Sequence, residues 1–323
     1  MPRLDIAAAV LILAATALAQ PTELEILRTF DGGDEAMLYR PDAVAFGPDG
    51  SIYVLNAGDC RVLRYDPDWQ LVRAFGREGE GPAEFNNPTG MLIRDDELWV
   101  FEQLRATIFG LDGAYVRTLA SRPEMHEPIE TDRGLLVRLG SSDRLAALLD
   151  QDLAITEKVG PECPADADFM TRFKTCGFVH VLPHPDHLAL LLNPFDGHLW
   201  VLGEDGSVVR ELDLVDDPGR SSSQTDDDGN ISMRFTMVMA TGGVDRHGNL
   251  WTLPVDPAVA DDEDAPQLVV VRDRAFEVIA EYVLPPETNA SRVVHAPDGT
   301  LLLLDGNASL IHVAAYPDAM VAP

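Results

Sequence analysis

The feature that most constrains the fold is an internal repeat of four short β-rich runs separated by turn residues. Its clearest copy, from Pro41 to Gly76, reads PDAVAFGPDGSIYVLNAGDCRVLRYDPDWQLVRAFG. PDG is a tight turn, because Pro presets φ and Gly supplies a positive φ, and DPD is a second turn. The four runs predict one four-stranded antiparallel blade, with strands at Asp42–Phe46, Ser51–Leu55, Arg61–Tyr65 and Gln70–Phe75.

The first of these turns recurs along the chain with a blade-sized period. Successive copies of its Asp are 46, 37, 54, 59 and 53 residues apart, so the loops vary in length. Six copies predict an all-β, six-bladed β-propeller built of four-stranded antiparallel blades. The recurring residues are Asp49, Asp95, Asp132, Asp186, Asp245 and Asp298.

The last repeat lacks a fourth strand. The earlier fourth strands share a pattern of apolar residues around a charged one, as in LVRAFG at Leu71, and ILRTFD at Ile26 fits the same pattern. We therefore predict that the N-terminal strand Ile26–Phe30 is the outer strand of the last blade. Such pairing closes the ring and removes an open sheet edge. A single propeller domain over residues 20–323 follows.

The N-terminus has the pattern of a signal peptide over residues 1–19. An apolar run from Ile6 to Leu18, too short to span a bilayer, ends in Ala17-Leu18-Ala19. Cleavage after Ala19 yields an exported protein, periplasmic or secreted, with no integral membrane segment. An uncleaved anchor is the alternative.

Export exposes the cysteines to an oxidising compartment. Cys163 and Cys176 are 13 residues apart in a polar stretch, and we predict that they form a disulfide. Cys60 is then unpaired, and a lone Cys is more often a small buried apolar residue than a nucleophile.

The chain is strongly acidic. It has 24 Lys and Arg against 54 Asp and Glu, a net charge of −30. The negative electrostatic field of this charge repels phosphate backbones, which argues against nucleic-acid binding. The acidity favours solubility, with a cation-binding surface as the alternative. We interpret two acidic runs, Asp226–Asn230 and residues 261–264, as solvated insertions, since the spacing of a calcium loop is absent.

The sequence resembles the NHL-type six-bladed propellers. The resemblance rests on the first repeat, on FGREGEGPAEFNNPTG from Phe75 to Gly90, and on the later GGVDRHGNLWTL and HAPDGTLLLLDG. It implies a ligand site on the face that carries the starts of the first strands and the loops between second and third strands, here named the funnel face. The opposite face, with the Asp-containing turns, is the turn face. The candidate ligand-binding residues are Arg40, Asp42, Asn87, Glu102, Arg105, His126, Glu130, His180, Asn193, Arg292 and Asn307.

Some six-bladed relatives, the gluconolactonase-like hydrolases, hold a divalent cation on the propeller axis, and GGVDRHGNLWTL resembles one of their segments. Where they would carry a metal-binding Asp, this chain has Thr241 or Gly242, and Glu102 does not match their first ligand. His184 and His187 flank a turn on the other face from His180, which argues against a zinc site. We therefore predict no cofactor and no metal ligands, with calcium or another divalent cation as the alternative.

These observations favour a non-enzymatic, monomeric binding module for an unidentified protein, peptide or glycan on the funnel face. No G-x-S-x-G nucleophile motif occurs. The alternatives are a metal-dependent hydrolase or lyase and a purely structural subunit.

Overall fold

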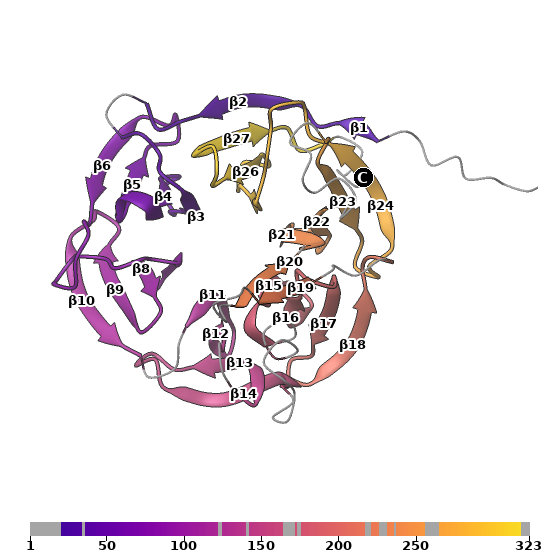
Figure 1. Ribbon diagram of the computed structural model, residues 1–323. Coiled ribbons are helices and arrows are strands. Elements are labelled where there is room, and N and C mark those ends of the chain that lie inside the picture. Colours follow the sequence, from indigo (N-terminus) through magenta and orange to yellow (C-terminus); the bar gives the residue numbers. More distant parts are fainter. Residues whose placement is uncertain are drawn as a thin grey trace, which may run out of the picture.

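The computed structural model shows six antiparallel blades around a central axis, as predicted (Figure 1). The first strand of each blade lies nearest the axis and the fourth lies at the rim. The structure describes residues 21–33, 36–121, 125–139, 142–163, 172, 176–216, 221–225, 231–235, 237–255 and 265–317. The predicted signal peptide and both acidic runs, 226–230 and 261–264, lie outside the described residues.

Each blade takes its strands in chain order from the axis outward. Blade 1 contains β3 (Pro41–Phe46), β4 (Ile52–Asn56), β5 (Arg61–Tyr65) and β6 (Leu71–Phe75), with a short 3-10 helix, η1 (Ala57–Asp59), after β4. Blade 2 contains β7 (Gly90–Arg94), β8 (Glu97–Glu102), β9 (Arg105–Gly110) and β10 (Tyr115–Ala120). Blade 3 contains β11 (His126–Thr131), β12 (Gly134–Arg138), β13 (Arg144–Leu149) and β14 (Ile155–Glu162).

The second half of the ring repeats this order. Blade 4 contains β15 (His180–His184), β16 (His187–Leu192), β17 (His198–Leu202) and β18 (Val208–Asp213). Blade 5 contains β21 (Met239–Val244), β22 (Leu250–Pro254), β23 (Leu268–Arg272) and β24 (Val278–Val283). Blade 6 contains β25 (Arg292–His295), β26 (Leu301–Asp305) and β27 (Leu310–Ala314), with β2 (Ile26–Phe30) as its outer strand.

The N-terminal strand closes the ring as the sequence predicts. β2 pairs antiparallel with β27, with Phe30 opposite Ile311. The Thr29 hydroxyl lies 3.0 Å from His312 Nδ1 across this pair. Phe30 also packs edge-on against two rings of blade 1, Tyr65 and Trp69, at centroid distances of 5.1 and 4.8 Å. The closing strand therefore joins blade 6 to blade 1 through side chains as well as main chain.

A second N-terminal contact was not predicted. The two-residue strand β1 (Thr22–Glu23) pairs parallel with β24, the outer strand of blade 5. The next residue, Leu24, is 2% exposed, and its N–H donates to the carbonyl oxygen of Val283 at 2.9 Å. A two-residue strand leaves no periodic signal in a sequence. The N-terminal segment thus crosses from blade 5 to blade 6.

The apolar core lies between the blades. Among the described residues, buried side chains form six clusters, and each cluster combines residues from two neighbouring blades. The cluster between blades 6 and 1 includes Val54 and Tyr65 from one and Leu302 and Ile311 from the other. Each blade therefore buries its two faces only when both neighbours are in place.

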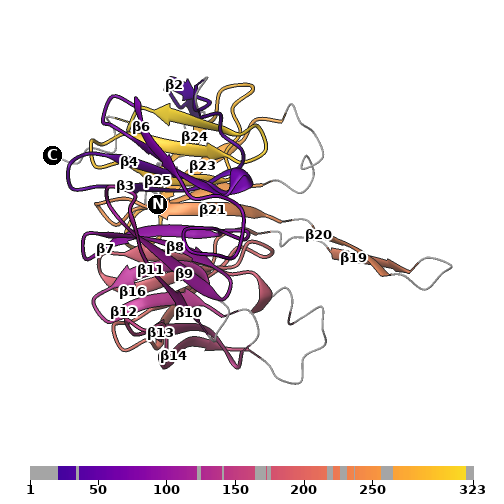
Figure 2. The ribbon, with the colours of Figure 1, turned by 90° about the vertical axis from the view of Figure 1, so that its left-hand side faces the viewer.

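An additional hairpin lies between blades 4 and 5. Its strands, β19 (Ser221–Thr225) and β20 (Ile231–Phe235), pair antiparallel and form no part of a blade. The hairpin projects away from the ring (Figure 2). Because β18 ends and β21 begins on the funnel face, the hairpin extends from that face. The sequence analysis did not predict a hairpin here.

Deleting residues 21–31 is expected to leave β27 as an open edge and to uncover the core between blades 6 and 1, costing more than about 4 kcal/mol of unfolding free energy. The variant should aggregate and melt without a cooperative transition, as measured by calorimetry and light scattering. Deleting residues 21–23 alone, which removes only β1, is the control and should stay monomeric. A soluble, cooperatively melting 21–31 deletion would contradict the role given to β2.

Candidate functional site

The recurring turn Asp residues have a local structural role. Asp49 Oδ1 accepts the N–H of Ser51 at 3.0 Å, and Asp298 accepts the N–H of Thr300 at 2.9 Å in the same way. Gly50 has a φ of 82°, which L side chains rarely adopt. Turn chemistry therefore explains these two copies of the turn without any ligand.

Two predicted site residues, Glu102 and Arg105, hold the segment between blades 1 and 2. Glu102 is 3% exposed, forms an ion pair with Arg105 and accepts the N–H of Asn86. Arg105 also donates to the carbonyl oxygens of Gly79 and Glu80, at 3.0 and 2.7 Å. These contacts consume much of the hydrogen-bonding capacity of both side chains.

Predicted residues in other loops behave similarly. Asn193 is fully buried, and its Oδ1 accepts the N–H of Phe195 at 2.9 Å. Asn56, at the matching place in blade 1, accepts the N–H of Tyr39 at 2.5 Å. Asn307 is exposed, and its N–H donates to Asp305 at 3.0 Å. A polar residue at the end of the second strand thus orders the following loop in several blades.

A cluster of charged and polar side chains lies near the axis on the funnel side, and we name it the axial cluster. It contains Asp42 of blade 1, Glu127 of blade 3, His180 of blade 4, Thr241 of blade 5 and Arg292 of blade 6. Glu127 Oε1 lies 2.7 Å from His180 Nδ1 and 4.0 Å from the nearer Arg292 nitrogen. Thr241 Oγ1 lies 3.1 Å from His180 Nε2. Residues of five blades therefore converge on one place.

Glu127 is central to the cluster and the sequence analysis missed it. The pairing of β11 with β12 shifts register between His126 and Ile129, and Glu127 has a φ of 48°. A bulge of this kind changes which side chains face a given side of a strand. The sequence has no Gly or repeated turn at this place, and its one local signal is Pro128, because a Pro inside a strand occurs at an edge or at a bulge.

The same register shift affects the positions of two neighbouring residues that were predicted to bind a ligand, His126 and Glu130. His126 lies opposite Arg138, at the funnel end of β11. Glu130 lies at the other end of the strand, one residue before the turn, and forms an ion pair with Arg94 at 3.4 Å. The prediction that Glu130 lies on the funnel face was therefore wrong.

The charges of the axial cluster stabilise one another. Burial opposes ionisation of Glu127, but its interaction with His180 and the positive charges of Arg292 and Arg138 outweigh burial and lower the pKa of Glu127 to about 2. Burial raises the pKa of Asp42 above its usual value, and Arg292 and Arg40 oppose the shift without cancelling it. The site therefore contains one firmly ionised carboxylate and one that is harder to ionise.

Five of the predicted residues lie in or beside the axial cluster: Arg40, Asp42, Asn87, His180 and Arg292. Arg40 donates to Asn87 Oδ1 at 3.1 Å. A cavity of about 280 Å³ extends along the axis from this cluster. Its polar lining includes Thr89, Glu127, Thr241, Arg292 and His295.

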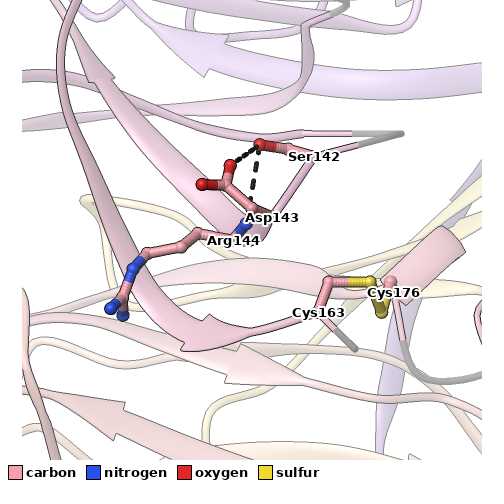
Figure 3. The surroundings of a disulfide bond; sticks show 5 residues. All are labelled: Ser142, Asp143, Arg144, Cys163 and Cys176. Atoms are coloured by element: carbon pink, nitrogen blue, oxygen red, sulfur yellow. Dashed lines mark hydrogen bonds between the residues drawn. A yellow bond between two sulfur atoms is a disulfide. The ribbon is translucent and has the colours of Figure 1, made fainter. Parts of the chain in front are cut away.

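A disulfide joins Cys163 and Cys176, the pairing expected from the sequence (Figure 3). Both cysteines are buried in the core between blades 3 and 4, and Cys163 N–H donates to the carbonyl oxygen of Asp143 at 2.8 Å. Closing a loop of this length is worth about 3 kcal/mol in the chain-entropy picture. The crosslink fixes the segment that leads into His180.

The axial residues fit a divalent cation poorly. Two guanidinium groups, Arg40 and Arg292, stand beside the two carboxylates, and Glu127 already binds His180 and the N–H of Val181. Within the described part of the chain, no group of three or more His, Cys, Asp or Glu side chains is arranged to hold a metal. His184 and His187, with ring centroids 4.8 Å apart, lie at the turn end of blade 4, away from His180.

No protein-family model matches this chain, and no curated protein sequence does. Solved structures match the fold at low identity. A streptogramin B lyase has a TM-score of 0.55 at 10% identity, covering 89% of this chain and 97% of that one. A member of the DUF4221 family from Bacteroides vulgatus has a TM-score of 0.58 at 11% identity, covering 91% and 98%.

A third match is a protein from Bacteroides fragilis that is assigned as exported, with a TM-score of 0.56 at 11% identity, covering 90% of this chain and 85% of that one. At such identities the likeness shows the fold alone. Among the described residues, no helix is long and apolar enough to cross a membrane.

Replacing Glu127 by Gln is expected to destabilise the protein in a pH-dependent way. The folded-state pKa of about 2 lies below the usual 4.5, so the stabilisation is complete above pH 4.5 and is lost as the pH falls towards 2. The wild-type advantage in unfolding free energy should be on the order of 3 kcal/mol at neutral pH and vanish near pH 2.

Urea unfolding at several pH values measures this difference. Glu23→Gln, on the exposed strand β1, is the control and should change stability by less than about 0.5 kcal/mol. A Glu127→Gln deficit that is the same at every pH would show that charge is not what Glu127 contributes.

Proposed function

We propose that the protein is an exported binding module that takes a segment of a peptide or protein on its funnel face. The observation that carries this is the placement of the exposed large apolar side chains among the described residues. Eight of them lie on the outer strands of blades, where the rim faces solvent. The other five lie in funnel-face loops, and the described turn-face loops have none. These five are Met37, Tyr39, Leu104, Phe178 and Met237.

The five apolar side chains belong to loops of several blades around the axial cluster. Tyr39 is 51% exposed and precedes β3, and Phe178 is 43% exposed and precedes β15. Aromatic, Met and Arg side chains are enriched at protein interfaces relative to other surfaces. A peptide offers both apolar side chains for the loops and a charged group for Arg40, Asp42 and Arg292. A glycan has fewer apolar groups to match the Met and Leu side chains.

The proposal places the protein outside the cytoplasm. The predicted signal peptide supports this, and so does the Cys163–Cys176 disulfide, because such bonds persist in oxidising compartments. We also propose an NHL-type relationship, supported by the first-repeat motif, and a monomer that binds no nucleic acid, in keeping with the charge of −30.

A hydrolase or lyase is the second candidate. A lyase is among the structures that share the fold, and Glu127, whose carboxylate lies 2.7 Å from His180, lines the axial cavity. Turnover of a lactone or ester that depends on an added divalent cation and on His180 would favour this candidate. The arginines beside the carboxylates favour the binding module, because their positive charges make the site a poor fit for a divalent cation.

Selection from a random peptide library on the purified protein tests the proposal. The selected peptides should bind the wild type, and Phe178→Ser or Arg292→Ala should weaken binding by at least about tenfold, because each removes an apolar or charged contact worth about 1.4 kcal/mol or more. Calorimetric titration measures the dissociation constants.

The matched control is Val209→Ser, which alters an even more exposed apolar residue on the outer strand β18. A library that yields no binders, or binders weakened only by Val209→Ser, would refute the funnel-face site. Binding of a glycan panel in place of peptides would reassign the ligand class.

A further inference from the structure

One guanidinium group of the axial cluster has donors to spare. The side chain of Arg292 is 27% exposed, and its ion pair with Glu127 is long, at 4.0 Å. That distance exceeds a hydrogen bond, and the guanidinium donates none to the described part of the chain. An Arg side chain carries five N–H donors in a planar fork that matches a carboxylate. Arg292 therefore offers unused donors at a place that solvent reaches.

The charges around Arg292 favour an anionic ligand group. Three arginines, Arg40, Arg138 and Arg292, act on the two carboxyl groups of the cluster, Asp42 and Glu127. The positive charges thus exceed the negative ones by one even when both carboxyl groups are ionised. Burial raises the pKa of Asp42, which makes its negative charge harder to form. One carboxylate from a ligand balances this excess.

The axial cavity continues from Arg292 towards the turn face. Its volume is about 280 Å³, room for about nine water molecules at roughly 30 Å³ each. The charged residues in its lining, Glu127 and Arg292, lie near the funnel ends of β11 and β25. A ligand group held by Arg292 therefore has a largely apolar space beside it. Apolar lining residues come from four blades: Met91, Ile129, Val181, Leu182, Val293 and Val294.

We propose that the axial cluster binds the C-terminal carboxylate of the peptide ligand and that the side chain of the last residue, of a large apolar type, enters the axial cavity. Arg292 donates to the carboxylate, and the rest of the peptide leads outward past the funnel-face loops that carry Tyr39 and Phe178. This inference rests on the proposed peptide-binding function and names the part of the peptide that reaches the axis.

A chain end fits the site better than an internal acidic residue does. The chain on both sides of an internal Asp or Glu leaves through the funnel, so its carboxylate reaches the axis but the apolar space stays unfilled. The last residue of a peptide carries a carboxylate and a side chain on one Cα atom and occupies both. A free small anion is disfavoured, because the net charge of −30 repels it at long range and it has no other contacts to offset that repulsion.

Two random peptide libraries screened on the whole protein test the proposal. One displays the peptides with free C-termini, and the other carries the same random segment fused at its C-terminus to the carrier. We expect the first library to yield the tighter binders, by at least about tenfold, with large apolar residues enriched at the last position.

The tightest peptide with a free C-terminus is then synthesised as the acid, as the C-terminal amide, and as an acid that ends in Gly. Calorimetric titration should show that the amide and the Gly-ended peptide each bind at least about tenfold more weakly than the acid. The amide loses a charge-assisted hydrogen bond, and the Gly-ended peptide loses a buried apolar side chain.

Arg292→Gln should weaken binding of the acid by about tenfold and binding of the amide by less than about threefold, because the amide has no charge for Arg292 to meet. The matched control is Arg61→Gln. Arg61 lies on the same face with 47% of its side chain exposed, paired with Asp59 at 3.3 Å, and its loss should change binding of the acid by less than about threefold. Should Arg292→Gln fail to fold, the three peptides titrated into the wild type decide the question.

Three results would overturn the proposal: equal affinity for the acid and the amide, unchanged affinity for the Gly-ended peptide, or equally tight binders from the fused library. If those binders are still weakened by Phe178→Ser, the funnel-face peptide site stands and only the carboxylate site fails. If neither library yields a binder, both the proposed function and this inference fail.

Discussion

The structure depends on the pairing of β2 with β27. Every core cluster is shared by two neighbouring blades, so no blade can bury its apolar faces alone. In a linear array of blades the first and last would each expose one face. The N-terminal strand prevents this, because it hydrogen-bonds to blade 6 and packs Phe30 against Tyr65 and Trp69 of blade 1. Two distant ends of the chain thereby complete a core that neither end could form alone.

The closed ring fixes the axial cluster. Its members come from five blades, and no two are close in sequence. A partly buried carboxylate such as Glu127 is tolerated only where partners compensate for its lost hydration, and here they are His180 and the Val181 N–H of blade 4 and Arg292 of blade 6. The distance between these partners is set by the ring. Opening the ring would therefore disturb the funnel-face site as well as stability.

Much of the fold could be predicted from the sequence, because blades repeat local patterns that depend on turn residues and alternating strands. The closing strand was predictable because ILRTFD repeats the fourth-strand pattern. Glu127 was not, since a one-residue bulge reverses the facing of a strand, and the neighbouring Pro128 is equally compatible with an edge strand that has no bulge. A charged side chain near a loop can bind a ligand or order the loop, and the sequence does not distinguish these two roles. Glu102 and Arg105 were predicted to bind a ligand, and the structure shows that they order the segment between blades 1 and 2.

Hydrogen–deuterium exchange with mass spectrometry tests most directly the claim that β2 is an integral strand of the ring. The account predicts that the hydrogen-bonded amides of β2 exchange only through global unfolding, with the same opening free energy as those of β26 in the interior of the same blade. The short β1 serves as the internal reference for a strand that frays. Exchange of β2 through local opening, several kcal/mol below that of β26, would contradict the account.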